Sequence, residues 1–258
     1  VHDDPFGSDM IGAIARHGRG LPANVIPFSM HSVTMMGHVE MAALFASGVE
    51  RIHFLADPKK ADELEGLKVE TSLCDAILSS LGLSELARCS LICDVQPDAV
   101  EAALWSSLEP MNLTVEQFSP VGSKRDIARL ALGKLHSVSK AKPDIIALPA
   151  GAPYGAVEID QSACTLCMAC TSACPASAII DTPGEPKLRF VESACVQCGL
   201  CVATCPEHAL SLKPQLDFTA AAKQPTILYE EEPFNCVVCG TPFATKSTIE
   251  RISAQLAE

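Results

Sequence analysis

The sequence lacks several features that would assign it to common protein classes. No stretch approaches the roughly 18 consecutive apolar residues of a membrane-spanning helix, so no membrane span is predicted. Between Val1 and Met30 there is no charged segment followed by an apolar one, as a secretory signal peptide would require. We therefore expect a cytoplasmic location, where cysteines stay reduced. The chain begins with valine rather than methionine, and the sequence alone leaves open whether it is a fragment of a longer protein.

Nucleotide-binding and hydrolytic signatures are absent as well. No G-x-G-x-x-G fingerprint or P-loop follows any candidate strand, and no acid/base constellation or activated nucleophile stands out. Positive charge is scarce: 19 Lys and Arg against 31 Asp and Glu give a formal net charge of -12. Such a surface repels nucleic acids and favours partner proteins that present basic patches.

Cysteine, in contrast, is abundant and ordered. Eight of the 13 cysteines form two copies of the pattern C-x2-C-x2-C-x3-C-P. A cubane iron-sulfur cluster requires four thiolates around one small volume, and two-residue spacings on a tight loop allow three of them to point into it together. The two copies consist of Cys164, Cys167, Cys170 and Cys174 before Pro175, and of Cys195, Cys198, Cys201 and Cys205 before Pro206.

The two cysteine runs belong to an internal repeat. An offset of 31 residues superposes Ser162-Ala163-Cys164 on Ser193-Ala194-Cys195. From about Val157 to Leu212 the chain resembles the bacterial dicluster ferredoxins, which hold two [4Fe-4S] clusters. In that family the fourth cysteine of each run ligates the other cluster. The resemblance implies that Cys164, Cys167, Cys170 and Cys205 bind one cluster, and that Cys195, Cys198, Cys201 and Cys174 bind the other.

Two other uses of these cysteines are conceivable, and the pattern disfavours both. Structural zinc sites use C-x2-C pairs separated by a longer loop, whereas three closely spaced cysteines would strain a tetrahedral zinc. A disulfide framework requires an oxidising compartment. We expect each half of the repeat to form a strand, a cysteine loop, a short helix and a strand. The expected strands are 157–159, 179–181, 189–191 and 210–212.

The N-terminal half predicts an α/β domain built on a doubly wound parallel sheet. Short continuous apolar runs predict buried parallel strands at 24–30, 51–56, 90–93 and 144–148. Helical periodicity occurs between them, above all at 123–139, where Ser123 and Asp126 form a capping pair. Asp57 and Asp94 follow two of the strands, and we interpret them as caps of the next helices rather than as ligands.

Part of this domain also resembles a redox protein family. The segments LPANVIPFSM from Leu21, AALFASGVERIHFLAD ending at Asp57, and LCDAILSSLGL ending at Leu83 are similar to the delta subunit of methyl-viologen-reducing hydrogenases and to heterodisulfide reductase segments. In that family, cysteines at the strand ends bind a [2Fe-2S] cluster. Met30 and Ala56 stand in the corresponding neighbourhoods here, so the resemblance implies a docking scaffold without that cluster.

Five cysteines remain outside the repeat. Cys74, Cys89 and Cys93 are irregularly spaced, and we interpret them as buried and inert. Cys236 and Cys239 form a C-x2-C-G knuckle that looks like half of a zinc ribbon. Because no second pair follows, the missing ligands would lie beyond Glu258, or the knuckle would bind no metal or borrow ligands from elsewhere.

These observations divide the chain into five segments. We expect an N-terminal extension at 1–20, an α/β docking domain at 21–150, an α+β dicluster ferredoxin domain at 156–214, a linker at 215–233, and the C-x2-C knuckle with a polar helix at 234–258.

The function predicted from the sequence is a relay of single electrons through two [4Fe-4S] clusters within an oxidoreductase complex. The partners would be redox enzymes such as a hydrogenase, a formate dehydrogenase or a heterodisulfide reductase-like enzyme. A different hypothesis is a reductase whose α/β domain holds its own flavin or substrate. In a third, the clusters only stabilise the fold. The donor, the acceptor and the potentials are not encoded in any recognisable motif.

Overall fold

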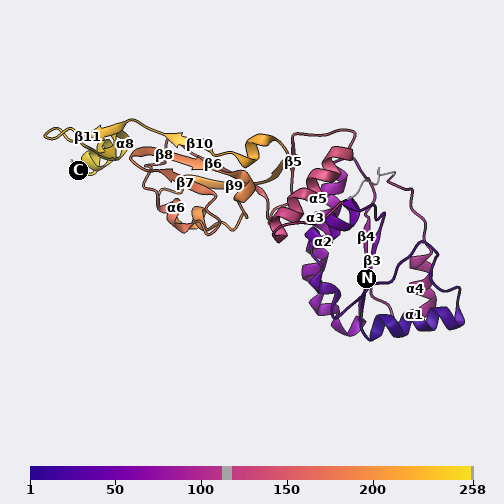
Figure 1. The fold of residues 1–258 in the computed structure, drawn as a ribbon. Helices are drawn as coiled ribbons and strands as arrows, with labels where there is room; N and C mark the ends of the chain where they lie inside the picture. Colours follow the sequence, from indigo (N-terminus) through magenta and orange to yellow (C-terminus); the bar gives the residue numbers. More distant parts are fainter. Residues whose placement is uncertain (112–117, 257–258) are drawn as a thin grey trace. The chain divides into compact units, whose positions relative to one another are not determined.

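The computed structural model describes residues 1–111 and 118–256 (Figure 1). The chain divides into two compact units, Val1–Pro143 and Asp144–Glu258, and each is described by itself. Among the described residues, no helix combines the length and the apolar character needed to cross a membrane.

Unit 1 contains a parallel sheet of short strands. Its order is β2-β1-β3-β4, and β3 pairs with β4 from Ile52↔Cys89 to Leu55↔Ile92. The strands are β1 (His2–Asp3), β2 (Ser29–Met30), β3 (Ile52–Leu55) and β4 (Cys89–Ile92). The helices are α1 (Phe6–His17), η1 (Val33–Met35), α2 (His38–Ala46), η2 (Pro58–Glu63), α3 (Glu65–Ser80), α4 (Pro97–Leu104) and α5 (Lys124–Val138).

Helices cover both faces of this sheet. Leu55 and Ile92 share a buried cluster with Met10 of α1 and Val100 of α4. Cys89 and Ile92 lie three positions apart in β4, so their side chains point to opposite faces of the sheet. On the face opposite Ile92, the Cys89 thiol lies 3.7 Å from the sulfur of Met41 in α2. Figure 1 shows α2, α3 and α5 together on that side. Unit 1 is therefore a mixed α/β unit around a parallel sheet.

The first 20 residues differ from the expected extension. β1 lies inside the sheet and pairs with both β2 and β3. Asp3 is buried, and its carboxylate accepts hydrogen bonds from the backbone N–H groups of Val33 at 2.6 Å and Asp57 at 3.2 Å. A strand of two polar residues has no hydrophobic pattern, so periodicity could not reveal it. The strand expected at 24–30 is likewise shorter and forms only at its end.

The strand expected at 144–148 exists but belongs to the other unit. β5 (Ile145–Ala147) pairs antiparallel with β9 (Leu210–Asp217), so the boundary between the units follows Pro143 rather than residue 150. Ile145 and Ala147 are exposed and Ile146 is buried, which is the pattern of a strand with one solvated face. An apolar run alone does not specify which sheet a strand joins.

Unit 2 is built from two similar halves. Each contains a strand, a cysteine loop, a short helix and a second strand, and the first strand of each half pairs antiparallel with the second strand of the other. The first half consists of β6 (Gly155–Ile159), α6 (Ala169–Ala173) and β7 (Ile179–Thr182). The second consists of β8 (Glu185–Phe190), η3 (Glu192–Ala194), α7 (Leu200–Thr204) and β9. Each of the four expected strands falls within or overlaps one of these strands.

The segment 215–233 is not a linker. β9 continues to Asp217, η4 (Ala220–Lys223) follows, and β10 (Thr226–Glu230) pairs antiparallel with β8 as a third strand of the β7-β8 sheet. Leu216 and Ala222 are buried. The mixed composition of this segment and its acidic run 230–232 resemble a linker in sequence, although β10 lies at a sheet edge.

The C-terminal segment has the expected order. The hairpin of β11 (Pro233–Asn235) and β12 (Pro242–Thr245) carries the knuckle, and α8 (Lys246–Leu256) matches the predicted polar helix. The capping pair is also confirmed: the Ser123 hydroxyl accepts a hydrogen bond from the Asp126 N–H, and the Asp126 carboxylate accepts one from the Ser123 N–H.

Candidate functional site

Left-handed backbone at matched positions shapes the two cysteine loops. Leu166 and Met168 in the first loop have φ of 52° and 60°, and Gln197 and Gly199 in the second have 54° and 77°. Non-glycine residues adopt this conformation at a cost of order 1–3 kcal/mol each. The repeated reversals curl each loop so that its three closely spaced thiols surround one space.

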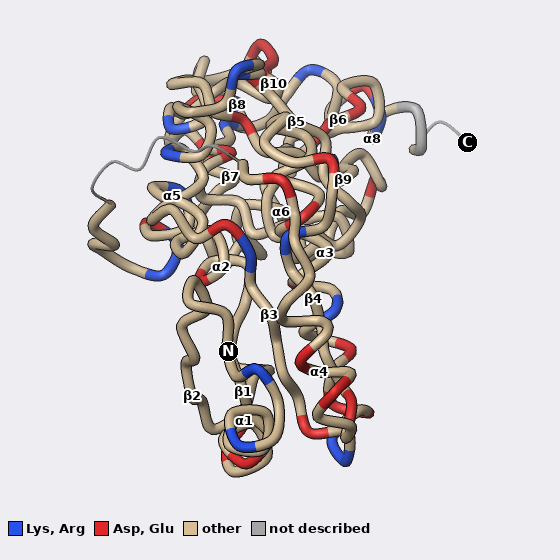
Figure 2. Tube along the Cα trace, turned by 90° about the vertical axis from the view of Figure 1, so that its right-hand side faces the viewer, with Lys and Arg blue, Asp and Glu red and all other residues tan. Residues whose placement is uncertain are grey.

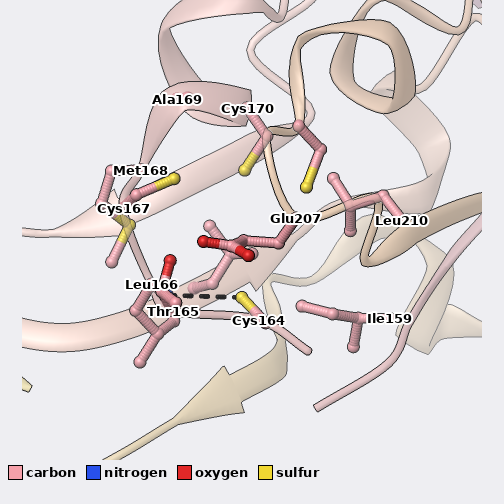
Figure 3. Close-up of a pocket in the computed structure, with 12 residues that line it drawn as sticks. Ile159, Cys164, Thr165, Leu166, Cys167, Met168, Ala169, Cys170, Glu207 and Leu210 are labelled. Carbon is pink, nitrogen blue, oxygen red and sulfur yellow. Dashed lines mark hydrogen bonds between the residues drawn. The ribbon is translucent and has the colours of Figure 1, made fainter. Parts of the chain in front are cut away.

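The first loop borders a pocket in unit 2. Four thiols line it, three from the first cysteine run and one from the end of the second: Cys164, Cys167, Cys170 and Cys205. Apolar side chains, among them Ile159 and Leu188, form much of the remaining wall. Figure 3 shows the sulfur atoms of the labelled cysteines around this space, with the Glu207 carboxylate beside them.

The second loop borders a matching pocket. The same exchange occurs, since three thiols come from the second run and one from the first: Cys195, Cys198, Cys201 and Cys174. Val157, Ile179 and Leu212 contribute apolar walls. The two quartets that line the pockets are the same sets that the ferredoxin resemblance groups together.

Burial raises the pKa values of the cysteine thiols, and hydrogen bonds from backbone N–H groups lower them. Desolvation raises the pKa of the Cys170 thiol to about 12, and it also raises the pKa of Cys164 and of Cys201. Backbone N–H groups point at several of the sulfur atoms, as between Leu166 N and Cys164 Sγ at 3.4 Å. These thiols are protonated without metal, so iron binding must displace their protons.

The donor set fits a cluster better than a single ion. Within the described residues, no three Cys, His, Asp or Glu side chains converge closely enough to hold one metal ion. The thiols instead surround a space with apolar walls and N–H donors, which suits a cubane with an iron atom near each sulfur. A tetrahedral zinc site would require four thiolates around one point.

The C-terminal helix packs against the first cysteine loop. The Thr248 hydroxyl donates to the Thr165 carbonyl at 2.9 Å, and the Arg251 guanidinium donates to the Glu207 carboxylate at 2.8 Å and the Ala163 carbonyl at 3.3 Å. Sequence reasoning had assigned no role to these residues. Their contacts link segments some 44 to 88 residues apart, which local patterns do not reveal.

The knuckle thiols lie on a tight turn. Cys236 N donates to the Thr241 carbonyl at 2.9 Å, and Gly240 N donates to the Cys236 carbonyl at 2.8 Å. Hydrogen bonding with Thr241 lowers the pKa of the Cys239 thiol. Because no third metal-binding side chain joins the pair among the described residues, the half zinc site stays a prediction.

The other candidates of unit 1 have structural contacts. Asp57 caps η2 through Lys59 N at 3.0 Å, and Asp94 accepts a hydrogen bond from Gln96 N at 2.8 Å. Cys74 and Cys89 are buried, as expected, whereas Cys93 is exposed at the end of β4. The expectation that all three are buried is therefore wrong for Cys93.

Comparison with known families identifies the cysteine region. A family model described as a 4Fe-4S dicluster domain matches residues 163–210, which include both cysteine runs. A second model with the same description matches residues 194–243, from the second run through the knuckle. No curated protein matches the chain. The region thus carries dicluster ferredoxin-type sequence, its cofactors are two [4Fe-4S] clusters, and its chemistry is iron-sulfur electron transfer.

Proposed function

We propose that this chain is an electron-transfer subunit of an oxidoreductase complex, in which unit 2 relays single electrons and unit 1 docks the partner. The observation that supports the relay best is the presence of two thiol quartets in matching pockets of unit 2. When bound, [4Fe-4S] clusters supply reversible one-electron redox chemistry. The protein residues hold them, exclude water and adjust their potentials.

The ligand assignment is part of this proposal. Cys164, Cys167, Cys170 and Cys205 hold the first cluster, and Cys195, Cys198, Cys201 and Cys174 hold the second. The composition of the two pockets supports it, because each contains the fourth cysteine of the other run. Each cluster then links the two halves of the repeat, as the exchanged strand pairs β6–β9 and β7–β8 already do.

Electrons must enter and leave through residues near solvent. Cys167 and Cys198 are exposed, whereas Cys170 and Cys201 are buried. Exposed Leu200 lies beside Cys201 in sequence. We propose that an electron enters near one of these two exposed thiols and leaves near the other. Each redox partner then needs to approach only one of the two cysteine loops.

The docking role of unit 1 is supported by apolar side chains beside an edge strand. Ile26 and Phe28 are 86% and 60% exposed and directly precede β2, which ends the sheet. Exposed large apolar residues at one place are typical of interaction surfaces. The partner classes that we propose are those expected from the sequence: a hydrogenase, a formate dehydrogenase or a heterodisulfide reductase-like enzyme.

Salt dependence tests whether the partner is bound permanently. Acidic residues occur in both units (Figure 2), and the net charge is -12. A transient carrier would associate by electrostatic steering and would lose its partner as salt rises. An apolar subunit interface predicts that a stoichiometric redox partner stays bound at high salt and is lost in an Ile26→Lys, Phe28→Lys variant. Retention by that variant, or dissociation by salt alone, would refute the docking surface.

Metal and flavin content separate the relay from a self-contained reductase. We expect anaerobically purified protein to contain about eight iron and eight sulfide per chain and no flavin. A stoichiometric flavin would favour the reductase hypothesis. Zinc that is present in this protein and lost in a Cys236→Ser, Cys239→Ser variant would establish the knuckle as a zinc site.

A further inference from the structure

Backbone N–H groups donate hydrogen bonds to matching sulfur atoms in the two thiol pockets. Leu166 N lies 3.4 Å from Cys164 Sγ, and its counterpart Gln197 N lies 3.4 Å from Cys195 Sγ. The same holds for the fourth cysteines, where Ala178 N and Ala209 N lie 3.2 and 3.4 Å from their sulfur atoms, Cys174 Sγ and Cys205 Sγ respectively. These pairs are related by the 31-residue offset. The main-chain hydrogen bonds therefore give little reason for the clusters to differ.

One side chain breaks this symmetry. The Gln197 amide Nε2 lies 3.4 Å from Cys195 Sγ, so it adds a second N–H donor to a sulfur that already accepts one from the backbone. At the matching position of the first loop stands Leu166, which lines its pocket and whose side chain has no hydrogen-bond donor. Among the described residues, the second pocket thus has a side-chain donor to sulfur at a position where the first pocket has an apolar side chain.

The orientation of the Gln197 amide is fixed by its surroundings. Nε2 also donates to the Ala156 carbonyl at 2.9 Å, and a carbonyl accepts hydrogen bonds only, so the nitrogen rather than the oxygen must face this side. Gly155 makes room for it, because a Cβ there would lie 2.6 Å from Gln197 Cδ and 2.8 Å from Nε2.

The same orientation leaves the amide oxygen of Gln197 without a hydrogen-bond donor. Gln197 Oε1 is buried and has no hydrogen-bond partner among the described residues. An unsatisfied buried polar atom destabilises the folded state. If Gln197 served packing alone, an apolar side chain such as that of Leu166 would avoid this cost. The amide instead places its N–H donor between the Ala156 carbonyl and Cys195 Sγ.

We propose that Gln197 holds the second cluster at a higher reduction potential than the first, so that the first electron comes to rest at the second pocket. This inference rests on the proposed ligand assignment. Reduction adds negative charge to the cluster and its thiolates, and a hydrogen-bond donor stabilises the reduced form more than the oxidised one.

Other lining residues also differ between the pockets, as Thr165 does from Val196, but among the lining residues in the described part of the chain only Glu207 carries a charge. Glu207 lines the first pocket, and its counterpart Ala176 lines the second. A carboxylate beside the first cluster would lower its potential; Arg251 pairs with this carboxylate at 2.8 Å and reduces that effect.

Glu231 also acts electrostatically on Cys164, and it would lower the potential of the first cluster as well. Both carboxylates separate the two potentials in the same direction as the Gln197 donor, and the Gln197 variants test the share of the donor alone.

A potentiometric titration monitored by electron paramagnetic resonance tests the proposal. The protein should show two reduction steps. Gln197→Leu, which copies the first loop, should shift the higher step downward and leave the lower step in place. Gln197→Glu, which keeps the size but replaces the donor with an acceptor, should shift the same step further downward.

Gln161→Leu is the matched control. Its amide donates to the Leu228 carbonyl at 3.2 Å and to no sulfur, so both steps should stay where they are. The two steps must first be present, with about eight iron per chain in every variant. A single step in the unchanged protein with about eight iron per chain would refute the difference in potential, whereas about four iron per chain would refute the proposed relay. Full iron content with an unshifted higher step in both Gln197 variants would overturn the role of Gln197 alone.

Discussion

The two units of this chain build their cores from different materials. In unit 1, the largest fully buried side chains are apolar, such as Phe45, Phe54 and Leu132. In unit 2, the buried cluster contains proposed ligands among its members: Cys170, Cys195 and Cys201 are buried in it, and Cys164, Cys174 and Cys205 pack against it. Unit 1 can fold on hydrophobic burial alone, whereas the centre of unit 2 is completed by its cofactors.

The largest expected difference between the two units is in their stability after iron is removed. Chelation under reducing conditions would leave unit 2 with two thiol-lined spaces in its core, and we expect it to unfold, because metal-ligand bonds replace hydrophobic packing there. Unit 1 should keep its fold. Limited proteolysis with mass spectrometry should then yield a protected fragment that ends near Pro143, and the holo protein should resist cleavage in both units. Equal protection of both units after chelation would contradict the comparison.

Two reciprocal substitutions test how the halves of unit 2 are linked. Cys205→Ser should impair the cluster of Cys164, Cys167 and Cys170 and spare the other, although Cys205 belongs to the second run. Cys174→Ser should have the opposite effect. Each variant should retain about half of the iron or a labile cluster at one site, and its remaining resonance signal should match the one that its counterpart loses. If each serine instead damages the cluster of its own run, the crossed assignment is wrong.

The smallest effect concerns pH and unit 1. Burial, with a contribution from nearby Arg51, lowers the pKa of His53 from 6.5 to about 4, and its ring lies 2.7 Å from Ser90 Oγ. The unfolded chain binds this proton below about pH 6.5, so the stability of unit 1 should fall as the pH drops from 6.5 toward 4.

Thermal unfolding of the chelated protein at about pH 7.5 and about pH 5.5 isolates this contribution, since unit 1 then provides the only transition. His53→Gln should lose less stability between the two pH values than the unchanged protein. An identical loss in both would mean that His53 does not contribute to the pH dependence.

The sequence predicted those parts that depend on local patterns. The repeated cysteine runs are local, and so are the capping pair at Ser123 and Asp126 and the helix 246–256, which the structure contains as predicted. Local sequence patterns do not predict the parts of the fold in which pairing between distant segments determines where a strand lies. β1 has only two polar residues yet lies within the sheet, and β5 has the composition of a parallel strand yet pairs antiparallel with β9.

The site shows the same division. The 31-residue offset places Gln197 opposite Leu166, and this difference is visible in the sequence. The direction of the Gln197 amide is not, because it depends on Gly155 and the Ala156 carbonyl, which arrive from β6. Arg251 was missed for the same reason, since it reaches Glu207 across 44 residues.

Electron paramagnetic resonance of the fully reduced protein, together with its iron content, tests the central claim most directly. Two clusters in neighbouring pockets of one small unit should give signals that develop one after the other, and these should broaden and split through magnetic interaction when both are reduced. The iron content should be about eight per chain. A single signal without interaction, with about four iron per chain, would contradict a relay through two clusters.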